Sequence, residues 1–329
     1  SAPTWSASSL NIPPEGDEMT KKIILDCDPG YDDAVAMLLA AGHPDVEVLA
    51  VTTVAGNQTI EKVTTNALRI AELCGLDCPV AAGSARPLVF GEVVPAPEIH
   101  GESGLDGTTL PEATRAPSEL SAARLIVDIL MREPAGTVTI VAIGPLTNIA
   151  LAARLEPRIV SRVREVVLMG GGTTIGNVRP MAEFNIENDP EAAHVVFEEA
   201  WPVVMVGLDL TYQARADLDV LERARRIDTP AGRFLSDVLQ AFAARYKRSA
   251  GFEAPPVHDP CAVAYVIDPS IVETEAHPVH VECRGEHTRG MTVVDRRRSA
   301  PKDGHVRVAV RLEKTKFWNT LFAAVERLR

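Results

Sequence analysis

The chain has 329 residues, of which 46% are hydrophobic and 24% are charged. This composition is typical of a globular protein that is long enough to bury a sizeable core. Its 33 Lys and Arg against 45 Asp and Glu give a net charge of −12, and an acidic chain without a basic block is a poor electrostatic match for nucleic acid or an anionic membrane.

Residues 1–18 differ in composition from the rest of the chain. They are rich in Pro, Ser and acidic residues, and they lack both the basic start and the apolar centre of a secretory signal. We expect a disordered extension outside the fold, natural or appended, with Met19 as a candidate natural start. The remainder, residues 19–329, has no internal repeat and no Gly/Ser linker, which favours one domain.

Short apolar runs rich in β-branched residues alternate with longer helical patterns along the chain. The runs that predict buried strands are 21–28, 46–56, 79–83, 137–144, 165–172 and 202–210. The patterns that predict helices are 32–42, 58–75, 189–200 and 316–328. Residues 290–295 and 305–313 alternate apolar and polar side chains, as half-exposed antiparallel strands do. The sequence therefore predicts a single α/β domain with a central, mostly parallel (mixed) sheet flanked by helices.

The five cysteines are odd in number and form no CxxC pair. They indicate reduced thiols in a cytoplasmic protein rather than a disulfide framework or a zinc site. No apolar run approaches the roughly 20 residues that a membrane-spanning helix needs, so we expect no membrane partner.

Four aspartates crowd into eight positions at the end of the first predicted strand and just beyond it: Asp26, Asp28, Asp32 and Asp33. Asp26 and Asp28 share a face if the strand persists, whereas Asp32 and Asp33 open a helix, where the helix dipole favours carboxylates. A hard cation such as Ca²⁺ or Mg²⁺ would relieve more of the repulsion, and a solvated turn with capping acids is the alternative. An EF-hand loop is excluded, because Tyr31 stands where that loop needs Gly.

Other predicted strands end in segments where a ligand could approach the backbone, as ligands do in sheets of this kind. Residues 141–150, VAIGPLTNIA, combine a strand, a Gly-Pro turn and a helix with Thr147 as a cap, and the carbonyls there belong to a cation site or to an ordinary turn. Residues 165–177 end a strand in three glycines, which admit a ligand or form a flexible turn. A dinucleotide-binding motif is excluded, because Ile175 stands where its third glycine would fall.

Residues 181–193, MAEFNIENDPEAA, alternate polar and apolar side chains. If this segment is extended, Glu183 and Asn185 lie on one face and Phe184 and Ile186 lie on the other. A carboxylate beside an amide makes a pair suited to sugar hydroxyls, with surface residues at a strand edge as the alternative.

Two histidines stand in segments of unusual composition. His258 and Asp259 come directly before a proline-started helix, where an ordinary N-cap and a functional pair are both open. His100 begins the glycine-rich run HGESGLDG, residues 100–107, which by composition is a mobile loop. Composition leaves open whether His100 is a surface residue or part of a lid.

These segments contain seven sequence blocks, which follow one another along the chain in this order: DCDPGYDDAVA, TTVAGNQT, HGESG, GPLTNIALAARLEP, VVLMGGG, AEFNIENDPEAA and VHDPCAVAYVIDP. Over Lys21 to Arg329 the chain resembles the nucleoside hydrolases, most closely the inosine–uridine-preferring branch. The Asp-x-Asp-Pro-Gly-x-Asp-Asp run after a buried strand is highly specific for that family. The resemblance implies a Rossmann-like nucleoside hydrolase fold and hydrolysis of the N-glycosidic bond of ribonucleosides to free base and ribose.

The resemblance also implies a tightly bound Ca²⁺ at the bottom of the pocket. Its implied ligands are Asp28, Asp33, Asp259 and the backbone carbonyl of Ile143, and Asp28 is also the implied general base for a Ca²⁺-bound water. The residues implied to contact the ribose are Asp32, Asn57, Asn177, Glu183 and Asn185, with Met169 against the sugar. By the same resemblance, His258 faces the leaving base, and His100 lies on a loop that closes over it. We expect His258 to protonate the base, because the charge of a histidine can change near neutral pH. Tyr246 lies in a segment where the match to the family thins, and we expect it to reach the base.

The implied chemistry agrees with the residue types present. Cleavage of an N-ribosidic bond builds positive charge on the ribose, and a pocket rich in carboxylates stabilises that charge. The expected partner is a small nucleoside in a salvage role, and the base-facing residues 243–256 leave the purine or pyrimidine preference open. The family further implies a homo-oligomer, a tetramer or a dimer.

Two other functions stay open on the sequence. Phosphatases of the haloacid dehalogenase type also place Asp-x-Asp after the first strand, but they continue with Thr where this chain has Gly30. They also need a lysine followed by an acidic pair at a strand end, of which we find no convincing version. The second alternative is a non-catalytic protein that binds nucleosides or Ca²⁺, although every inferred catalytic position carries a residue type that can act.

Overall fold

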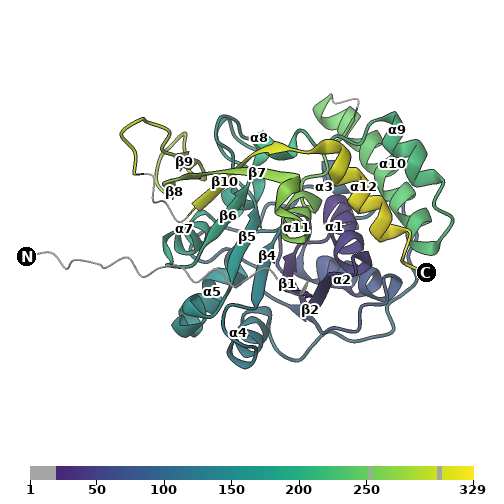
Figure 1. Cartoon of the computed structure of the whole chain (residues 1–329), viewed down its shortest axis with the longest axis horizontal. Coiled ribbons are helices and arrows are strands. Elements are labelled where there is room, and N and C mark those ends of the chain that lie inside the picture. Colours follow the sequence, from purple (N-terminus) through teal and green to yellow (C-terminus); the bar gives the residue numbers. More distant parts are fainter. Residues whose placement is uncertain (1–19, 252–253, 302–305) are drawn as a thin grey trace, which may run out of the picture.

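The computed structural model describes residues 20–251, 254–301 and 306–329 (Figure 1). Its centre is an eight-stranded sheet with the strand order β3-β2-β1-β4-β5-β6-β10-β7. These strands are β1 (Lys21–Cys27), β2 (Val46–Thr53), β3 (Val80–Ala82), β4 (Val138–Ala142), β5 (Glu165–Met169), β6 (Val203–Val206), β7 (Val272–His277) and β10 (Val306–Leu312). All neighbours run parallel except β10 and β7. The predicted mixed sheet is confirmed, and the predicted extension at residues 1–18 lies outside the described residues.

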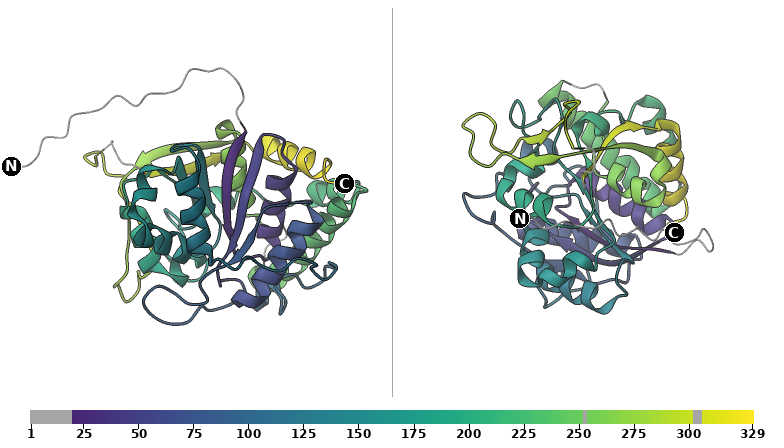
Figure 2. Two further views of the ribbon diagram at one scale, coloured as in Figure 1. Left: turned by 90° about the horizontal axis from the view of Figure 1, so that it is seen from below. Right: turned by 60° about the vertical axis from the view of Figure 1, so that its left-hand side comes forward.

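Helices cover both faces of the sheet (Figures 1 and 2). One apolar core is enclosed by α1 (Tyr31–Gly42), α2 (Ile60–Leu73), α9 (Leu218–Arg225), α10 (Pro230–Ala250), α11 (Pro260–Ile267) and α12 (Lys314–Val325). The second core is enclosed by α4 (Ala122–Arg132), α5 (Thr147–Leu155) and α7 (Pro190–Glu198). Shorter helices connect these layers: α3 (Pro97–His100), α6 (Phe184–Asn188), α8 (Leu208–Thr211) and the 3₁₀ turns Pro157–Ser161 and Pro269–Ile271. Among the described helices, none is long and apolar enough to cross a membrane.

The first strand and helix show why the buried segments are apolar throughout. Along β1, Ile23 and Leu25 point into the first core, whereas Ile24 points into the second. Both faces of the strand are therefore covered, which explains its unbroken apolar run. In α1, every residue except Ala41 is buried, because α11 and α12 both pack against it. Burial of each large aliphatic side chain in these layers contributes about 1.5–3 kcal/mol relative to exposure.

Two local predictions are wrong. Residues 184–188 are not extended, because Glu183 caps the short helix α6 through its carboxylate. The Glu183 carboxylate accepts the backbone N–H groups of Asn185 and Ile186, which stabilises the first turn of the helix. The alternation of polar and apolar side chains had predicted a strand instead. Thr147 does not cap α5, since the N-cap is Leu146 and the Thr147 hydroxyl donates to Asp189 Oδ2 at 2.6 Å.

The C-terminal strands divide between two sheets. β9 (Thr292–Val294) pairs antiparallel with β8 (Val279–Val281) in a hairpin outside the main sheet. β10 instead enters the main sheet between β6, to which it is parallel, and β7, to which it is antiparallel. The predicted antiparallel pairing is thus confirmed for residues 292–294 and only on one edge for β10.

Candidate active site

A cavity of about 820 Å³ lies where the carboxyl ends of β1, β4 and β5 meet. Of the residues singled out in the sequence, its lining includes Asp32, Asn57, His100, Ile143, Met169, Asn177, Glu183, Asn185, Tyr246, His258 and Asp259. Asp28 and Asp33 lie beneath this lining, and both are bonded to Asn57. The sheet therefore brings together side chains that are far apart in the sequence, at the edge where parallel α/β proteins bind ligands.

Four aspartate carboxyls are buried at the floor of this cavity. Asp32, Asp33 and Asp259 each place a carboxylate oxygen within 4.8 Å of the others, a spacing at which they could hold one metal ion. Asp28 lies beside this group, since its backbone N–H donates to Asp33 Oδ1 at 2.9 Å. The four side chains come from the segment after β1, the first turn of α1 and the start of α11, which meet because α1 and α11 pack together.

Burial and mutual repulsion raise the pKa values of these carboxyls. Burial, followed by the charge of Asp33, raises the pKa of Asp32 to about 8. The same two causes raise the pKa of Asp28 well above its ordinary value, and burial followed by the charge of Asp32 does so for Asp259. Such a cluster favours bound protons or a bound cation, because either one reduces the repulsion between the carboxylates.

The Asp28 carboxylate lies between two glycines. Its Oδ2 atom accepts the backbone N–H of Asn57 at 2.6 Å, whereas its buried Oδ1 atom has no hydrogen-bond partner among the described residues. A Cβ atom at Gly56 would come within 2.1 Å of Oδ2, and one at Gly144 would come within 2.6 Å of Oδ1. Both glycines therefore let the backbone after β2 and after β4 approach the carboxylate closely. Sequence reasoning missed Gly56, for which the signal is a glycine as the last residue of a predicted strand.

A carboxylate and an amide form the wall beyond β5. The Glu183 carboxylate accepts the backbone N–H of Asn185 at 3.0 Å and that of Gly171 at 2.9 Å. Burial raises the pKa of Glu183 to about 7 in spite of these bonds. The Asn185 side chain donates to the carbonyl oxygens of Ile143 at 3.1 Å and Met169 at 3.0 Å. This wall is therefore tied to the ends of both β4 and β5.

Two further asparagines reach the cavity from loops. The Asn57 side chain donates to the carbonyl oxygen of Asp28 at 3.1 Å and to Asp33 Oδ2 at 3.0 Å. The Oδ1 atom of Asn177 accepts the backbone N–H of Phe184 at 2.9 Å. Asn57 thus fastens its loop to the aspartate cluster, and Asn177 fastens its loop to the start of α6.

Imidazole and aromatic rings form another part of the lining. Nδ1 of His258 hydrogen-bonds to the Thr211 hydroxyl at 2.7 Å, and burial lowers the pKa of His258 to about 4. The Tyr212 ring stands edge-on to His258, with centroids 5.6 Å apart. Tyr246 packs edge-on against Phe242, with centroids 5.2 Å apart. At neutral pH, His258 is therefore an uncharged imidazole that keeps Nε2 for the cavity.

His100 ends α3 and is buried, so the surface alternative is wrong for this residue. Its Nδ1 atom accepts the backbone N–H of Tyr31 at 3.1 Å, and burial lowers the pKa of His100 to about 3. Its ring stacks on Phe242 with centroids 6.0 Å apart. The glycine-rich segment that follows is fastened internally, because the Asp106 carboxylate accepts two of its backbone N–H groups at 3.1 and 3.0 Å.

Several residues that line the cavity or hold its walls were missed in the sequence. Tyr212 and Phe242 belong to the lining. Arg245 joins α10 to the His100 segment, because it donates to Asp106 Oδ2 at 2.8 Å and to the carbonyl oxygen of Pro97 at 3.2 Å. No local pattern separates such residues from ordinary core and surface positions of an amphipathic helix.

Comparisons with known proteins agree with this arrangement. Residues 23–319 match the family described as inosine-uridine preferring nucleoside hydrolase. A protein of that description from Crithidia fasciculata is 52% identical over 312 residues, which cover 94% of this chain and 99% of the relative. One from Leishmania major is 51% identical over 312 residues, with the same coverage. The pyrimidine-specific ribonucleoside hydrolase RihA from Escherichia coli O157:H7 is 46% identical over 279 residues, covering 84% of this chain and 89% of the relative.

Solved structures show the same likeness in three dimensions. The purine-preferring ribonucleoside hydrolase from Gardnerella vaginalis superposes with a TM-score of 0.88 at 34% identity, covering 94% of this chain and 99% of that one. The family overturns the haloacid dehalogenase alternative and confirms the resemblance and the fold class inferred from the motifs. The chain therefore belongs to the inosine-uridine preferring nucleoside hydrolase family, whose members are glycosidases that act on N-glycosyl compounds.

Proposed function

We propose that the chain hydrolyses inosine and uridine at this cavity, releasing the free base and ribose. Support for both substrates comes from the relatives that share 52% and 51% identity, which are named for inosine and uridine together. The observation that carries the proposal is the group of four buried carboxyls beside the amide-lined wall. Charge that develops on the ribose as the N-glycosidic bond breaks is stabilised by carboxylates held in a low-dielectric site.

The residues at the cavity floor fit a hard divalent cation, which we propose to be Ca²⁺. The proposed ligands are the carboxylates of Asp28, Asp33 and Asp259 and the carbonyl oxygen of Ile143, with Asp32 at the same cluster. Carboxylate and carbonyl oxygens are the ligands that Ca²⁺ prefers, and carboxylate oxygens of Asp32, Asp33 and Asp259 lie within 4.8 Å of one another. When bound, such an ion supplies Lewis-acid chemistry, holding vicinal hydroxyls and lowering the pKa of a water molecule.

Asp28 is the proposed general base. Because the Asn57 N–H holds Oδ2, the Oδ1 atom remains to take the proton of the attacking water. A positioned base of this kind contributes typically about 10²–10⁴-fold to the rate.

The ribose is proposed to bind beside the wall that Glu183 and Asn185 form. The side chains proposed to bind its hydroxyls are Asp32, Asn57, Asn177, Glu183 and Asn185, and Met169 packs against the sugar. Several of these side chains already have protein partners that fix their orientation, as Asn185 does with Ile143 and Met169. A wall held in this way binds the diol without first having to be ordered.

The base is proposed to leave along the aromatic part of the lining. There, His258 donates from Nε2 of its neutral imidazole to the departing base, while Thr211 fixes the ring through Nδ1. The pKa of about 4 makes a charged imidazolium a minor species at neutral pH, so the proposed role is a hydrogen bond that stabilises the charge developing on the departing base, which takes its proton from solvent water. His100 and Tyr246 are proposed to contact the base.

Assembly and biological setting stay predictions from the family. We propose a homo-oligomer, a tetramer or a dimer, in the cytoplasm, with a role in nucleoside salvage. Light scattering on the purified protein measures the number of subunits directly.

A panel of ribonucleosides tests the proposed reaction. Free ribose is measured for inosine, uridine and other common ribonucleosides, before and after the protein is treated with chelator and then resupplied with Ca²⁺. We expect release of ribose from inosine and uridine, its loss after chelation and its return with Ca²⁺. Calorimetric binding of intact inosine without any released ribose would instead favour the non-catalytic alternative.

A further inference from the structure

The β8–β9 hairpin, residues 279–294, lies outside the main sheet yet reaches the cavity. Its base packs on α7, because Val279 and Val281 join the core that contains Val196 and Phe197 (Figure 1). At its other end, Arg289 belongs to the cavity lining. The hairpin therefore links α7 to the cavity lining, although it lies outside the main sheet.

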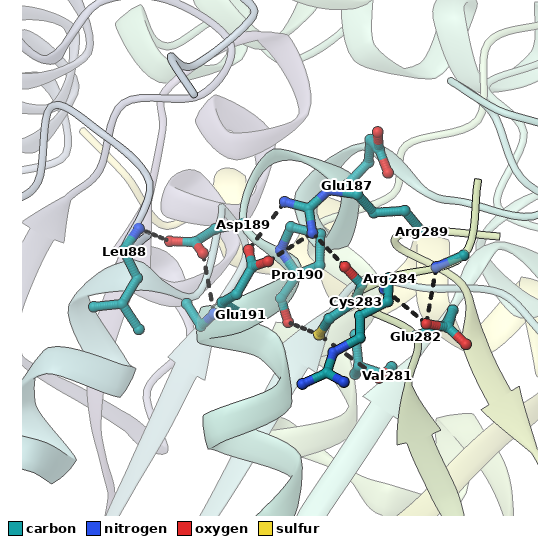
Figure 3. Close-up of polar contacts among 12 residues, drawn as sticks. Leu88, Glu187, Asp189, Pro190, Glu191, Val281, Glu282, Cys283, Arg284 and Arg289 are labelled. Carbon is teal, nitrogen blue, oxygen red and sulfur yellow. Dashed lines mark hydrogen bonds and ion pairs between the residues drawn. The ribbon is translucent and has the colours of Figure 1, made fainter. Parts of the chain in front are cut away.

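Arg289 fastens the hairpin to α7. Its guanidinium donates to both carboxylate oxygens of Glu191, at 2.6 and 3.0 Å, and to the carbonyl oxygen of Cys283 at 2.8 Å (Figure 3). The Cys283 thiol adds a weaker bond to the carbonyl oxygen of Pro190 at 3.4 Å, seen beside the same group in Figure 3. The bidentate pairing of Arg289 with Glu191 fixes the orientation of the guanidinium, because two parallel hydrogen bonds join the two groups.

Thr292, on the same hairpin, holds the glycines that follow β5. Its hydroxyl donates to the carbonyl oxygen of Gly172 at 2.7 Å and accepts the N–H of Gly172 at 3.0 Å. The side chain is completely buried, and a Cβ atom at Gly171 would come within 2.7 Å of it. Gly171 also has φ +72°, so both the space and the backbone conformation require glycine here.

The hairpin contacts the chain on both sides of the hydrogen bond between Gly171 and Glu183. Gly171, next to the peptide that Thr292 grips, donates its N–H to Glu183 Oε2 at 2.9 Å. Ala182, directly before Glu183, pairs with Met291, directly before Thr292, in an isolated β-bridge. One short segment of the hairpin therefore sets the position of the donor and of the acceptor.

We propose that Thr292 is a positioning residue for Glu183, and that Arg289 anchors the hairpin that carries Thr292. This inference rests on the proposed function, in which Glu183 binds a ribose hydroxyl. Removal of the Thr292 hydroxyl leaves the buried N–H of Gly172 without a partner, so the glycine segment shifts and Gly171 no longer holds the carboxylate. The Glu183 carboxylate then binds the ribose hydroxyl less well, so kcat/KM falls.

A double-mutant cycle separates this role from a merely structural one. We expect Thr292→Val to lower kcat/KM for inosine about tenfold, and Thr292→Ser, which keeps the hydroxyl, to stay within about threefold of the wild type. In a Glu183→Ala background, Thr292→Val should cost less than about twofold, because the group through which it acts is gone. Equal losses in both backgrounds would overturn the inference.

Amide hydrogen exchange tests the positioning without any turnover. Thr292→Val should speed exchange of the amides of Gly171 and Gly172 relative to both the wild type and Thr292→Ser, since their hydrogen bonds depend on the hydroxyl. Unchanged exchange overturns the inference even when the enzyme is active. A wild type that releases no ribose overturns the proposed function instead, while the exchange result still decides whether Thr292 positions the glycines.

Arg289→Met tests the anchor and remains informative when Thr292→Val fails to fold. We expect about a fivefold loss of kcat/KM for inosine. Arg311→Met is the matched control, because Arg311 pairs with Glu273 at 2.7 Å between β10 and β7, outside the cavity lining. Equal effects of the two substitutions on kcat/KM contradict the proposed role of Arg289.

Discussion

Asn57 holds Asp28 at two points. Its backbone N–H donates to Asp28 Oδ2 at 2.6 Å, and its side-chain amide donates to the Asp28 carbonyl oxygen at 3.1 Å. The main chain and the carboxylate of Asp28 are therefore fixed together, with Oδ1 left for chemistry. Because this geometry exists before substrate binds, little reorganisation remains for the reaction itself.

Replacement of that carboxylate tests its role as the base. We expect Asp28→Ala to lower kcat for inosine by about 10²–10⁴-fold while the protein stays folded, because the water loses its proton acceptor. Ribose release measures kcat, and circular dichroism checks the fold. Asp219→Ala, at an exposed position of α9, is the control and should leave kcat unchanged. Near-normal turnover by Asp28→Ala removes Asp28 from the mechanism.

The role of His258 depends on the leaving group. We expect His258→Ala to slow inosine hydrolysis by about 10²-fold, because the departing base loses a hydrogen-bond donor. Hydrolysis of p-nitrophenyl riboside should change by less than about threefold, since its leaving group departs without protonation. Steady-state rates on both substrates decide the matter, and an equal loss on both denies His258 this role.

The buried Glu183 predicts a pH dependence of stability. Burial raises its pKa from the ordinary 4.5 to about 7, so the folded protein binds more protons than the unfolded chain between these values. Its stabilising contribution is therefore fully present below about pH 4.5 and is lost as the pH rises through about 7.

Glu183→Gln removes this titration. Between about pH 5 and pH 8, the wild type should lose on the order of 2 kcal/mol more of its free energy of unfolding than Glu183→Gln does. Urea titrations of both proteins at the two pH values give the difference. Parallel changes in the two proteins contradict the raised pKa.

Arg245 links the aromatic lining to the His100 segment. We expect Arg245→Met to lower kcat/KM for inosine about fivefold, because α10 loses its bonds to Asp106 and to the carbonyl oxygen of Pro97. Arg233→Met is the matched control on the same helix, since Arg233 pairs with the exposed Asp228 at 2.7 Å. Equal kcat/KM values for Arg245→Met and Arg233→Met would contradict the proposed role of Arg245.

Much of the fold and of the cavity floor could be predicted from local sequence. The apolar run before Asp28 predicts a strand covered on both faces, and the ends of parallel strands meet at one edge, which brings Asp28 and Ile143 together. Asp259 instead precedes α11 and reaches Asp28 because α1 and α11 pack together. Glu183 lines the cavity, but the extended conformation predicted around it is wrong. The alternation around it has the period of a strand, whereas its carboxylate accepts the N–H groups of a short helix instead.

The rest depends on contacts between distant parts of the chain. Thr292 reaches Gly172 from a hairpin outside the main sheet, and no spacing in the sequence records that contact. Phe242 lies on an amphipathic helix where a core aromatic residue and a cavity-lining one have the same pattern. Such residues are found only when the packing of the helices on the sheet is known.

Titration of chelator-treated protein with Ca²⁺ in a calorimeter tests the central claim most directly, because it asks whether the buried aspartates hold a cation. We expect the wild type and Asp219→Asn to bind one Ca²⁺ per chain, and Asp33→Asn to bind at least about 10²-fold more weakly, since a buried carboxylate ligand is lost. No binding by a folded wild type, or equal affinity in Asp33→Asn, would contradict the account.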